Sequence, residues 1–219
     1  MTTMSAGVAP RCVGWRRQLR LLGRHVRTVG RERAVRRREL VELFHGVNAW
    51  LREVGVVHWI AYGTLLGWHR ERALLAHDVD VDFGATVAGY ESLRRAGGRL
   101  PRGFSLRDSS HRHHGPKLYV SYRGWEADIY FYEERDGRLC PLLRSREPGD
   151  AIPLPRAWIE PRVAVAFLGA TTYVPAEPVK CLETFYGYIG PDAVRDPVTR
   201  YFRPRQPGAA DARNRAASQ

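Results

Sequence analysis

Residues 62–84 read YGTLLGWHRERALLAHDVDVDFG, and the rest of the predicted fold is arranged around this stretch. It opens with a glycine-containing turn at Gly63 and Thr64. A short helical run over residues 65–71 follows, and the alternating pattern after it predicts a strand over residues 78–83. The stretch therefore predicts a turn, a helix and an acidic strand in close succession.

The predicted strand carries aspartates at three alternate positions. Because successive side chains of a strand point to opposite faces, the carboxylates would share one face and the apolar residues between them the other. Carboxylates about 6.5–7 Å apart repel and raise one another's pKa unless a cation lies between them. A hard divalent cation, which prefers oxygen ligands, is the simplest partner for Asp78, Asp80 and Asp82.

An EF-hand loop and a surface charge cluster are the alternatives for these aspartates. An EF-hand loop that starts at Asp78 needs glycine at its sixth position and glutamate at its twelfth, where this chain has Phe83 and Gly89. The other alternative, in which the aspartates are surface charges paired with arginines, is disfavoured because the turn before them suits a phosphate group. Backbone N–H groups after Gly63, together with the positive end of a helix, suit phosphate oxygens. A phosphate site beside carboxylates is typical of Mg²⁺-assisted phosphoryl or nucleotidyl transfer.

A further carboxylate is expected from a second strand. Residues 117–123 (KLYVSYR) and 125–132 (WEADIYFY) meet at Arg123 and Gly124, which predicts a hairpin. Asp128 lies in the second strand among apolar and aromatic residues, where an acid is costly to bury unless it is paired or binds a metal. Asp128 is therefore the candidate that completes the ligand set.

The composition is that of a globular protein whose basic residues gather at its two ends. The 219 residues are 44% hydrophobic and carry a formal net charge of +12. Residues 11–38 contain eleven arginines and one acidic residue, and residues 200–219 contain five arginines and one acidic residue. The chain between these two segments is therefore slightly acidic. We predict a basic N-terminal extension over residues 1–38, one catalytic domain over residues 39–199 and a disordered basic tail over residues 200–219.

The extension bears on the expected location of the protein. No apolar run is long enough for a signal peptide or a membrane span, so we expect a cytoplasmic protein. The amphipathic helix predicted over residues 15–29 fits either docking on its own domain or peripheral contact of residues 11–38 with an anionic membrane. Nucleic acid is the weakest alternative, because basic and aromatic residues do not interleave there. The scattered Cys12, Cys140 and Cys181 predict free thiols rather than disulfides or a zinc site.

The remaining elements follow from periodicity and turn signals. His58 is predicted to be a packed core histidine, and the histidine-rich loop over residues 108–115 to face solvent or substrate. Residues 133–162 read as irregular and rich in proline. The other predictions are a core helix over residues 34–54, a strand over 56–61, a helix over 87–97, a strand over 104–107, a hairpin over 163–174 and a helix over 178–186.

The order of these motifs resembles a known family. A Gly-Thr turn, an Asp-x-Asp strand and a later aspartate resemble the nucleotidyltransferase superfamily of the polymerase-beta type. Residues 62–84 resemble more closely the LicD/fukutin signature, in which a GTLLG-type turn leads through an arginine to a DxD strand. Weaker similarity at ADIYFY around Asp128 and at LETFYGYIGP (182–191) extends the resemblance to residues 39–191. It implies an α+β fold, with a nucleotidyltransferase-like mixed β-sheet flanked by helices in a single domain.

The resemblance also implies roles for individual residues. Asp80 and Asp82 match the metal-binding DxD, and Asp128 matches the third acid, so these three would be catalytic and would hold Mg²⁺ or Mn²⁺. Asp128 would hold a second ion or help to deprotonate the acceptor. Many relatives carry Trp and Asp where this chain has His77 and Val79, which makes Asp78 an auxiliary acid. Gly63, Thr64 and Arg70 match the substrate side of the signature. Lys117, which the resemblance does not cover, is a further candidate for binding the substrate, because Arg70 or Lys117 could offset negative charge there. An ordinary surface ion pair is the alternative for Arg70 and Lys117.

The implied activity is transfer of a phospho-substituent, of the phosphocholine or alditol phosphate type, from a CDP-activated donor. The acceptor would be a hydroxyl of a glycan or lipid-linked glycan, as in the modification of cell-surface polysaccharides, and CMP would be released. Two alternatives stay open. One is a nucleotidyltransferase that moves NMP from an NTP to a small molecule or protein, and the other is a non-catalytic module that binds membranes or glycans.

Overall fold

The computed structural model describes residues 33–142 and 148–206 of the chain. The chain divides into two units, Met1–Arg36 and Arg37–Gln219, and the second unit contains the sheet and the candidate site. The predicted helix over residues 15–29, the residue Cys12 and the tail beyond residue 206 lie outside the described residues. In the described parts of the chain, no helix combines the length and apolar character needed to cross a bilayer.

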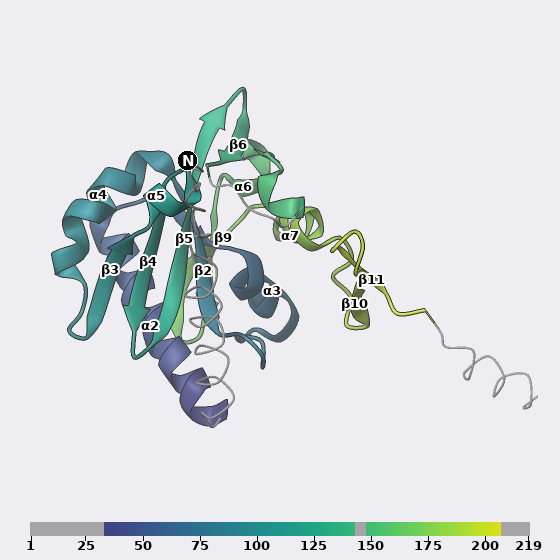
Figure 1. Cartoon of the computed structure of the whole chain (residues 1–219), viewed down its shortest axis with the longest axis horizontal. Coiled ribbons are helices and arrows are strands. Elements are labelled where there is room, and N and C mark those ends of the chain that lie inside the picture. Colours follow the sequence, from purple (N-terminus) through teal and green to yellow (C-terminus); the bar gives the residue numbers. More distant parts are fainter. Residues whose placement is uncertain (1–32, 143–147, 207–219) are drawn as a thin grey trace, which may run out of the picture. The chain divides into compact units, whose positions relative to one another are not determined.

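The centre of the second unit is a mixed seven-stranded β-sheet (Figure 1). Five strands follow the order β1-β2-β5-β4-β3, and β6 and β7 continue from β5. Among these described strands β2 and β5 run parallel, whereas the other neighbouring pairs run antiparallel. The strands are β1 (His58–Ile60), β2 (Asp80–Thr86), β3 (Phe104–Asp108), β4 (Lys117–Tyr122), β5 (Trp125–Arg135), β6 (Arg138–Pro141) and β7 (Leu154–Pro155).

One face of the sheet is apolar and packs against α2 (Arg33–Val54) and α4 (Tyr90–Arg95). Phe44 of α2 stacks on Phe83 of β2 with 5.9 Å between ring centroids, and Tyr90 of α4 meets Phe131 of β5 edge to face. The helix predicted over residues 34–54 is therefore confirmed. Its buried apolar residues recur at helical spacing and are Leu40, Leu43, Phe44, Val47, Trp50 and Leu51.

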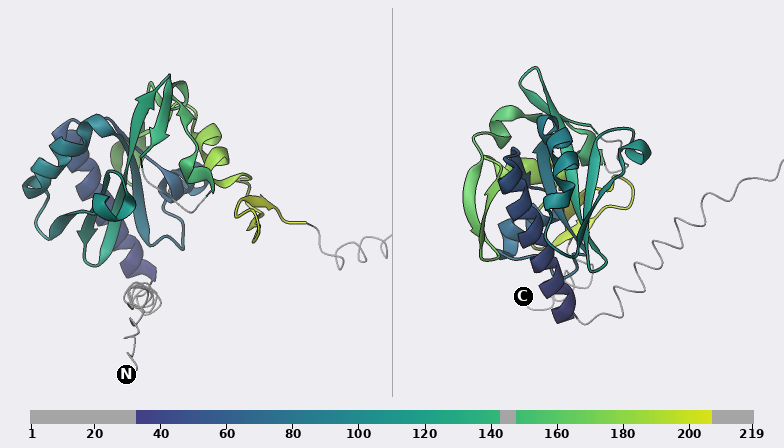
Figure 2. Two further views of the ribbon diagram at one scale, coloured as in Figure 1. Left: turned by 45° about the horizontal axis from the view of Figure 1, so that its top comes forward. Right: turned by 90° about the vertical axis from the view of Figure 1, so that its left-hand side faces the viewer.

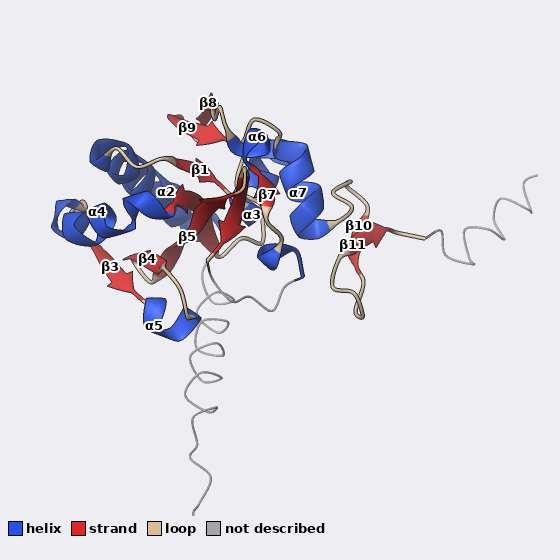
Figure 3. Cartoon of the chain, turned by 90° about the horizontal axis from the view of Figure 1, so that it is seen from above, coloured by secondary structure: helices blue, strands red, loops and turns tan. Residues whose placement is uncertain are grey.

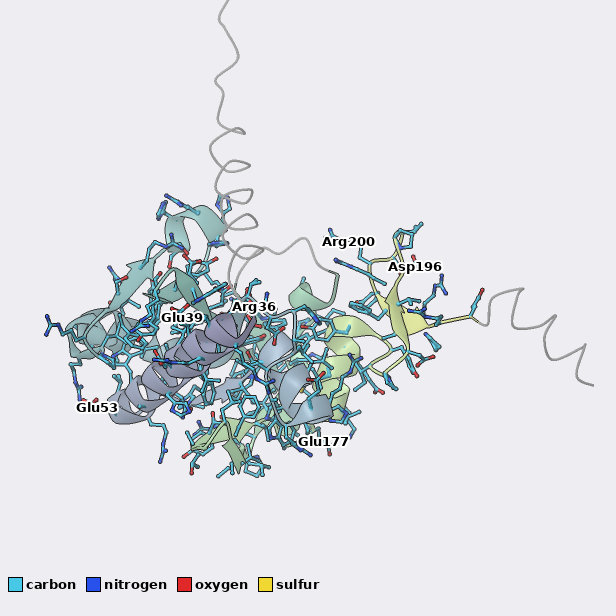
Figure 4. All side chains as sticks on the ribbon, turned by 90° about the horizontal axis from the view of Figure 1, so that it is seen from below. Arg36, Glu39, Glu53, Glu177, Asp196 and Arg200 are labelled. Carbon is cyan, nitrogen blue, oxygen red and sulfur yellow. The ribbon has the colours of Figure 1, made fainter. Side chains whose placement is uncertain are left out.

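Polar contacts also hold α2 in place, and two of its acids are labelled in Figure 4. The indole Nε1 of Trp125 donates a hydrogen bond of 2.7 Å to the buried carboxylate of Glu39. Glu53, nearer the end of the helix, forms an ion pair with Arg99. These contacts fasten the part of α2 between Glu39 and Glu53 to neighbouring elements of the second unit.

The opposite face of the sheet is covered in part by α3 (Tyr62–Glu71) and α7 (Pro178–Tyr186). The ring of Tyr62 packs against Tyr130 of β5 and Phe185 of α7, with centroids 4.6 and 4.5 Å away. Figure 3 shows α3 and α7 on the side of the sheet away from α2 and α4. The sheet is thus a middle layer between two layers of helices.

Shorter elements complete the described structure. The strand β5 continues beyond β2 and forms with β6 a hairpin that projects past the other strands (Figure 2, left). The predicted hairpin over residues 163–174 is confirmed as β8 paired with β9. The remaining elements are η1 (Val87–Gly89), η2 (Ala96–Arg99), α5 (Ser110–His113), η3 (Pro148–Ala151), α6 (Arg156–Ile159), β8 (Val163–Phe167), β9 (Ala170–Val174), β10 (Ala193–Arg195) and β11 (Phe202–Pro204).

Several predicted boundaries are wrong. The acidic strand begins at Asp80 and runs to Thr86, so Asp78 precedes it. The helix after Ala61 begins at Tyr62, so Gly63 lies in its first turn rather than in a turn before it. The region over residues 133–162 holds the end of β5, then β6, β7 and α6, and β11 falls within the predicted tail, where it pairs with β10.

Candidate active site

The three predicted acids lie together where β2 and β5 run side by side. Asp82 of β2 is the direct register partner of Asp128 of β5, and Asp80 is one alternate position earlier on the same face. One carboxylate oxygen from each of the three lies within 4.8 Å of the others. The predicted set of Asp80, Asp82 and Asp128 is therefore one cluster, which we call the acid cluster.

Two residues at the start of α3 form hydrogen bonds with Asp82, one with its carboxylate and one with its backbone. The Gly63 N–H donates a hydrogen bond of 3.1 Å to Asp82 Oδ2, and the Thr64 hydroxyl oxygen accepts one of 2.8 Å from the Asp82 N–H. A Cβ at position 63 would lie 3.4 Å from the same carboxylate, which is an ordinary van der Waals contact. The Gly63 N–H therefore binds Asp82 in this structure, and its predicted contact with phosphate stays a prediction.

Asp78 is not the third member of a row. Its carboxylate accepts a hydrogen bond of 2.8 Å from the Leu75 N–H, which closes the connection between α3 and β2. The backbone turns there and enters the strand only at Asp80, so strand alternation does not relate Asp78 to the other two acids. Its negative charge still lies close enough to help raise the pKa of Asp82.

The acid cluster is electrostatically unfavourable by itself. Asp82 is buried, and this burial, together with repulsion from Asp80 and Asp128, raises the pKa of its carboxyl well above the ordinary value. The nearby ammonium of Lys117 opposes part of that rise. Three converging oxygen ligands with a surplus of negative charge fit a hard divalent cation, and Asp80, Asp82 and Asp128 would hold it.

Lys117 lies inside the protein rather than on its surface. Its side chain is 2% exposed, and its Nζ is 3.3 Å from Asp128 Oδ2 and 3.0 Å from the centroid of the Tyr130 ring. Burial lowers the pKa of Lys117, and the carboxylates of Asp128 and Asp82 act in the opposite direction. An ordinary surface ion pair is therefore excluded for Lys117.

Arg70 lies apart from the acid cluster in its recorded contacts. Its guanidinium donates hydrogen bonds of 2.7–2.9 Å to the backbone oxygens of Ile189 and Gly190. These bonds tie α3 to the segment that follows α7. The structure thus gives Arg70 a bracing role, and the predicted contact with substrate stays a prediction.

The sequence predictions missed the tyrosines that surround the acids. The Tyr130 hydroxyl donates a hydrogen bond of 3.1 Å to Asp128 Oδ2, and Tyr119 of β4 is the register partner of Asp128. The Tyr119 hydroxyl contacts Nε2 of His113 at 3.1 Å, which brings one end of the predicted histidine loop near this face. Period-two alternation in KLYVSYR and WEADIYFY places Lys117, Tyr119, Asp128 and Tyr130 on one face, and that signal could have found them.

The acid cluster lies on two parallel strands of a mixed sheet, and the N-terminus of α3 forms hydrogen bonds with one of its acids. This arrangement is the one expected of a nucleotidyltransferase-type domain. The family described as "LicD/FKTN/FKRP, nucleotidyltransferase domain" matches residues 55–177, which is more than half of the chain. The chain belongs to this family. The resemblance seen in residues 62–84 and around Asp128 is thereby confirmed, as is the α+β fold class.

Curated relatives are similar over the same region. The proteins named ribitol-5-phosphate transferase FKTN from Mus musculus and Homo sapiens are 26% and 24% identical to this chain over 162 residues. These alignments cover 69% of this chain and 33% of each relative. The chain therefore spans about a third of the length of the curated relatives it matches.

Solved structures show more distant similarity. A crystal structure of ANT(2")-Ia in complex with adenylyl-2"-tobramycin is 13% identical, with a TM-score of 0.42, and the match covers 62% of this chain and 68% of that one. A solution structure of the antibiotic-resistance factor ANT(2'')-Ia is also 13% identical, with a TM-score of 0.44 and coverage of 66% and 80%.

Proposed function

We propose that this chain is a metal-dependent transferase that moves an alditol phosphate from a CDP-activated donor to a glycan hydroxyl. The observation that supports the proposal is the acid cluster of Asp80, Asp82 and Asp128 within the segment that matches the family. The curated relatives are named for transfer of ribitol 5-phosphate, which favours an alditol phosphate over phosphocholine as the transferred group.

The reaction would be a displacement at phosphorus. The acceptor oxygen bonds to the distal phosphorus of the donor, the bond from that phosphorus to CMP breaks, and the hydroxyl proton leaves to water. Mg²⁺ or Mn²⁺, when bound, neutralises charge on the diphosphate. The chain's own residues supply the three carboxylates that hold the ion, and the start of α3 keeps Asp82 in place.

Asp128 is assigned to metal binding rather than to removal of the acceptor proton. Its Oδ2 already meets Lys117 Nζ at 3.3 Å and the Tyr130 hydroxyl at 3.1 Å. Both contacts hold the carboxylate of Asp128 in one position. This geometry suits a residue that holds charge in a fixed position.

The test is a panel of CDP-linked donors. The full chain is incubated with Mg²⁺ and CDP-ribitol, CDP-glycerol or CDP-choline together with glycan acceptors, and CMP is measured. We expect CMP release with a CDP-alditol, a loss of at least about 10²-fold in Asp80→Asn, and little change in Glu91→Gln, an exposed carboxylate paired with Arg94. Full turnover by Asp80→Asn would contradict the proposal.

The same panel tests the alternatives. Pyrophosphate release from NTPs without CMP release from CDP-alditols would indicate the nucleotidyltransferase that moves NMP. Binding of glycans or vesicles with neither product would indicate a non-catalytic module. The products therefore separate the three functions in one experiment.

We also propose that residues 11–38 attach the protein to anionic membrane surfaces near its acceptors, on the cytoplasmic side. Their eleven arginines and single acid support electrostatic attraction to such lipids. Co-sedimentation with phosphatidylserine vesicles should fall when Arg16, Arg17, Arg20 and Arg24 are changed to glutamine in the full chain. Unchanged co-sedimentation of that variant would overturn the attachment proposal.

A further inference from the structure

We infer that Lys117 limits the acid cluster to one divalent cation, so that any second ion must arrive with the donor. The inference rests on the proposed function, because it takes the acid cluster to be the metal site. It assigns to Lys117 a positioning role toward Asp128 in place of the substrate contact predicted from the sequence.

Lys117 is buried beside Asp128 on the same face of the sheet. Its register partner on β5 is Tyr130, so its side chain rises on the same face as Asp128, one alternate position away. Its side chain is 2% exposed, with Nζ 3.0 Å from the ring centroid of Tyr130 and 4.9 Å from that of Tyr119. Aromatic faces attract an ammonium and stabilise it between them. Lys117 is thus enclosed beside the acids and does not reach out to a substrate.

Two carboxylate oxygens of the acid cluster already have partners in the protein. Asp128 Oδ2 meets Lys117 Nζ at 3.3 Å and accepts a hydrogen bond of 3.1 Å from the Tyr130 hydroxyl. Asp82 Oδ2 accepts a hydrogen bond of 3.1 Å from the Gly63 N–H. In a two-metal site, shared carboxylates commonly bridge ions about 3.5–4 Å apart. With one oxygen of Asp128 and one of Asp82 already engaged, the acid cluster suits a single ion.

The charge of the site also favours a single ion. Asp78, whose charge acts on Asp82, and the three acids of the cluster carry four negative charges when ionised, and Lys117 adds one positive charge. Two divalent cations would therefore leave an excess of positive charge in a partly buried site, whereas without the charge of Lys117 they would not. A donor diphosphate brings the negative charge that a second ion requires. Asp78, whose carboxylate accepts the Leu75 N–H, lies outside this ligand set.

The decisive measurement is the number of Mn²⁺ ions bound per chain at pH 7 without any donor. Free and bound Mn²⁺ are separated by electron paramagnetic resonance during titration of the full chain with MnCl₂ in a buffer free of phosphate and nucleotide. Asp80→Asn measured in parallel identifies ions bound elsewhere, including any at the histidine loop. We expect the difference between the two proteins to be one ion per chain.

Variants test whether Lys117 sets that number. Lys117→Met keeps a long buried side chain without its charge, and it should bind two ions, with the first at least about tenfold tighter. Tyr130→Phe removes the other partner of Asp128 Oδ2 but no charge, and it should keep one. Lys180→Met, which removes an exposed lysine paired with Glu177, should also keep one. Lys117→Gln serves the same purpose if Lys117→Met does not fold.

The outcomes distinguish this inference from the proposed function. Two ions on the wild-type chain, or one ion on a folded Lys117 variant, would overturn the role of Lys117 and leave the metal site intact. No ion on the wild-type chain would remove the metal site and with it the proposed function. The number of Mn²⁺ ions bound by the wild-type chain tests the limit of one ion even if neither Lys117 variant folds.

Discussion

Asp82 and Asp128, 46 residues apart in the sequence, are direct partners on the parallel strands β2 and β5. The parallel pairing carries both side chains to the same face at the same height, so the two carboxylates converge without help from a loop. A shift of this register by one residue would send one of them to the apolar face beneath α2. The site therefore depends on the pairing of these two strands.

Asp82→Asn should make the metal-free protein more stable. Burial and repulsion from Asp80 and Asp128 raise the pKa of Asp82, so its charge opposes folding, whereas an amide oxygen can still accept the Gly63 N–H. We expect a gain of about 1 kcal/mol, or roughly 2–4 °C in Tm for a chain of this size, by thermal unfolding with chelator present. Saturating Mn²⁺ should reverse the order, because it stabilises only the protein that binds it. A lower Tm of the metal-free variant would contradict the prediction.

His58 should make stability depend on pH. It is 1% exposed, and desolvation lowers its pKa to about 4, so the unfolded chain binds its proton more readily than the folded protein does. Between the ordinary pKa of 6.5 and about 4, stability therefore falls as pH falls, by about 2 kcal/mol from pH 7 to pH 5. His58→Gln, which does not titrate, should lose about 2 kcal/mol less over that range in urea unfolding. Parallel pH dependences of the two proteins would show that His58 does not contribute.

Gly84→Ala should destabilise the sheet. A Cβ at this position in β2 would overlap the indole ring of Trp59, its partner on β1. We expect a loss of about 1–3 kcal/mol from overpacking, measured by urea unfolding. Gly98→Ala is the matched control, because an added Cβ there meets nothing within 4 Å. Trp59→Leu should partly rescue Gly84→Ala, and a purely additive double variant would argue against a steric cause.

Arg70→Gln should affect stability more than chemistry. The variant loses the hydrogen bonds to the carbonyl oxygens of Ile189 and Gly190, so amides of residues 187–190 should exchange faster with deuterium and unfolding should cost about 1 kcal/mol less. Arg102→Gln, at an exposed position, is the control. A loss of donor turnover comparable to that of Asp80→Asn, with unchanged exchange, would instead restore the predicted contact with substrate.

The acid cluster could be predicted because its signals are local and periodic. Asp80 and Asp82 alternate within one strand, and Asp128 is an unexpected acid in an apolar one, so both strands indicate the residues that need a partner. The need for a further ligand predicts that Asp128 comes from a second strand beside the first, and the pairing of β2 with β5 confirms it. The chemical role of each acid stays a prediction until the variants are measured.

The boundaries and the buried lysine could not be predicted in the same way. HDVDVDFG continues the alternation back to Asp78, and only the hydrogen bond to the Leu75 N–H shows that the strand starts at Asp80. Glycine has a low helix propensity, so the Gly63-Thr64 pair predicted a turn where the structure has the first turn of α3, which begins at Tyr62. Lysine is normally exposed, so the burial of Lys117 follows only from its place between Tyr119 and Tyr130.

The packing of Tyr62 has a practical consequence for how this domain is cut. The segment that matches the family ends at residue 177, yet Phe185, which covers the ring of Tyr62, comes after it, and α2 precedes it at residues 33–54. An expression fragment trimmed to residues 55–177 would expose Tyr62 on one side of the sheet and Phe83 on the other. Fragments and chimaeras should therefore begin before α2 and end after Gly190, because the unit that folds is longer than the unit that is recognisable by sequence.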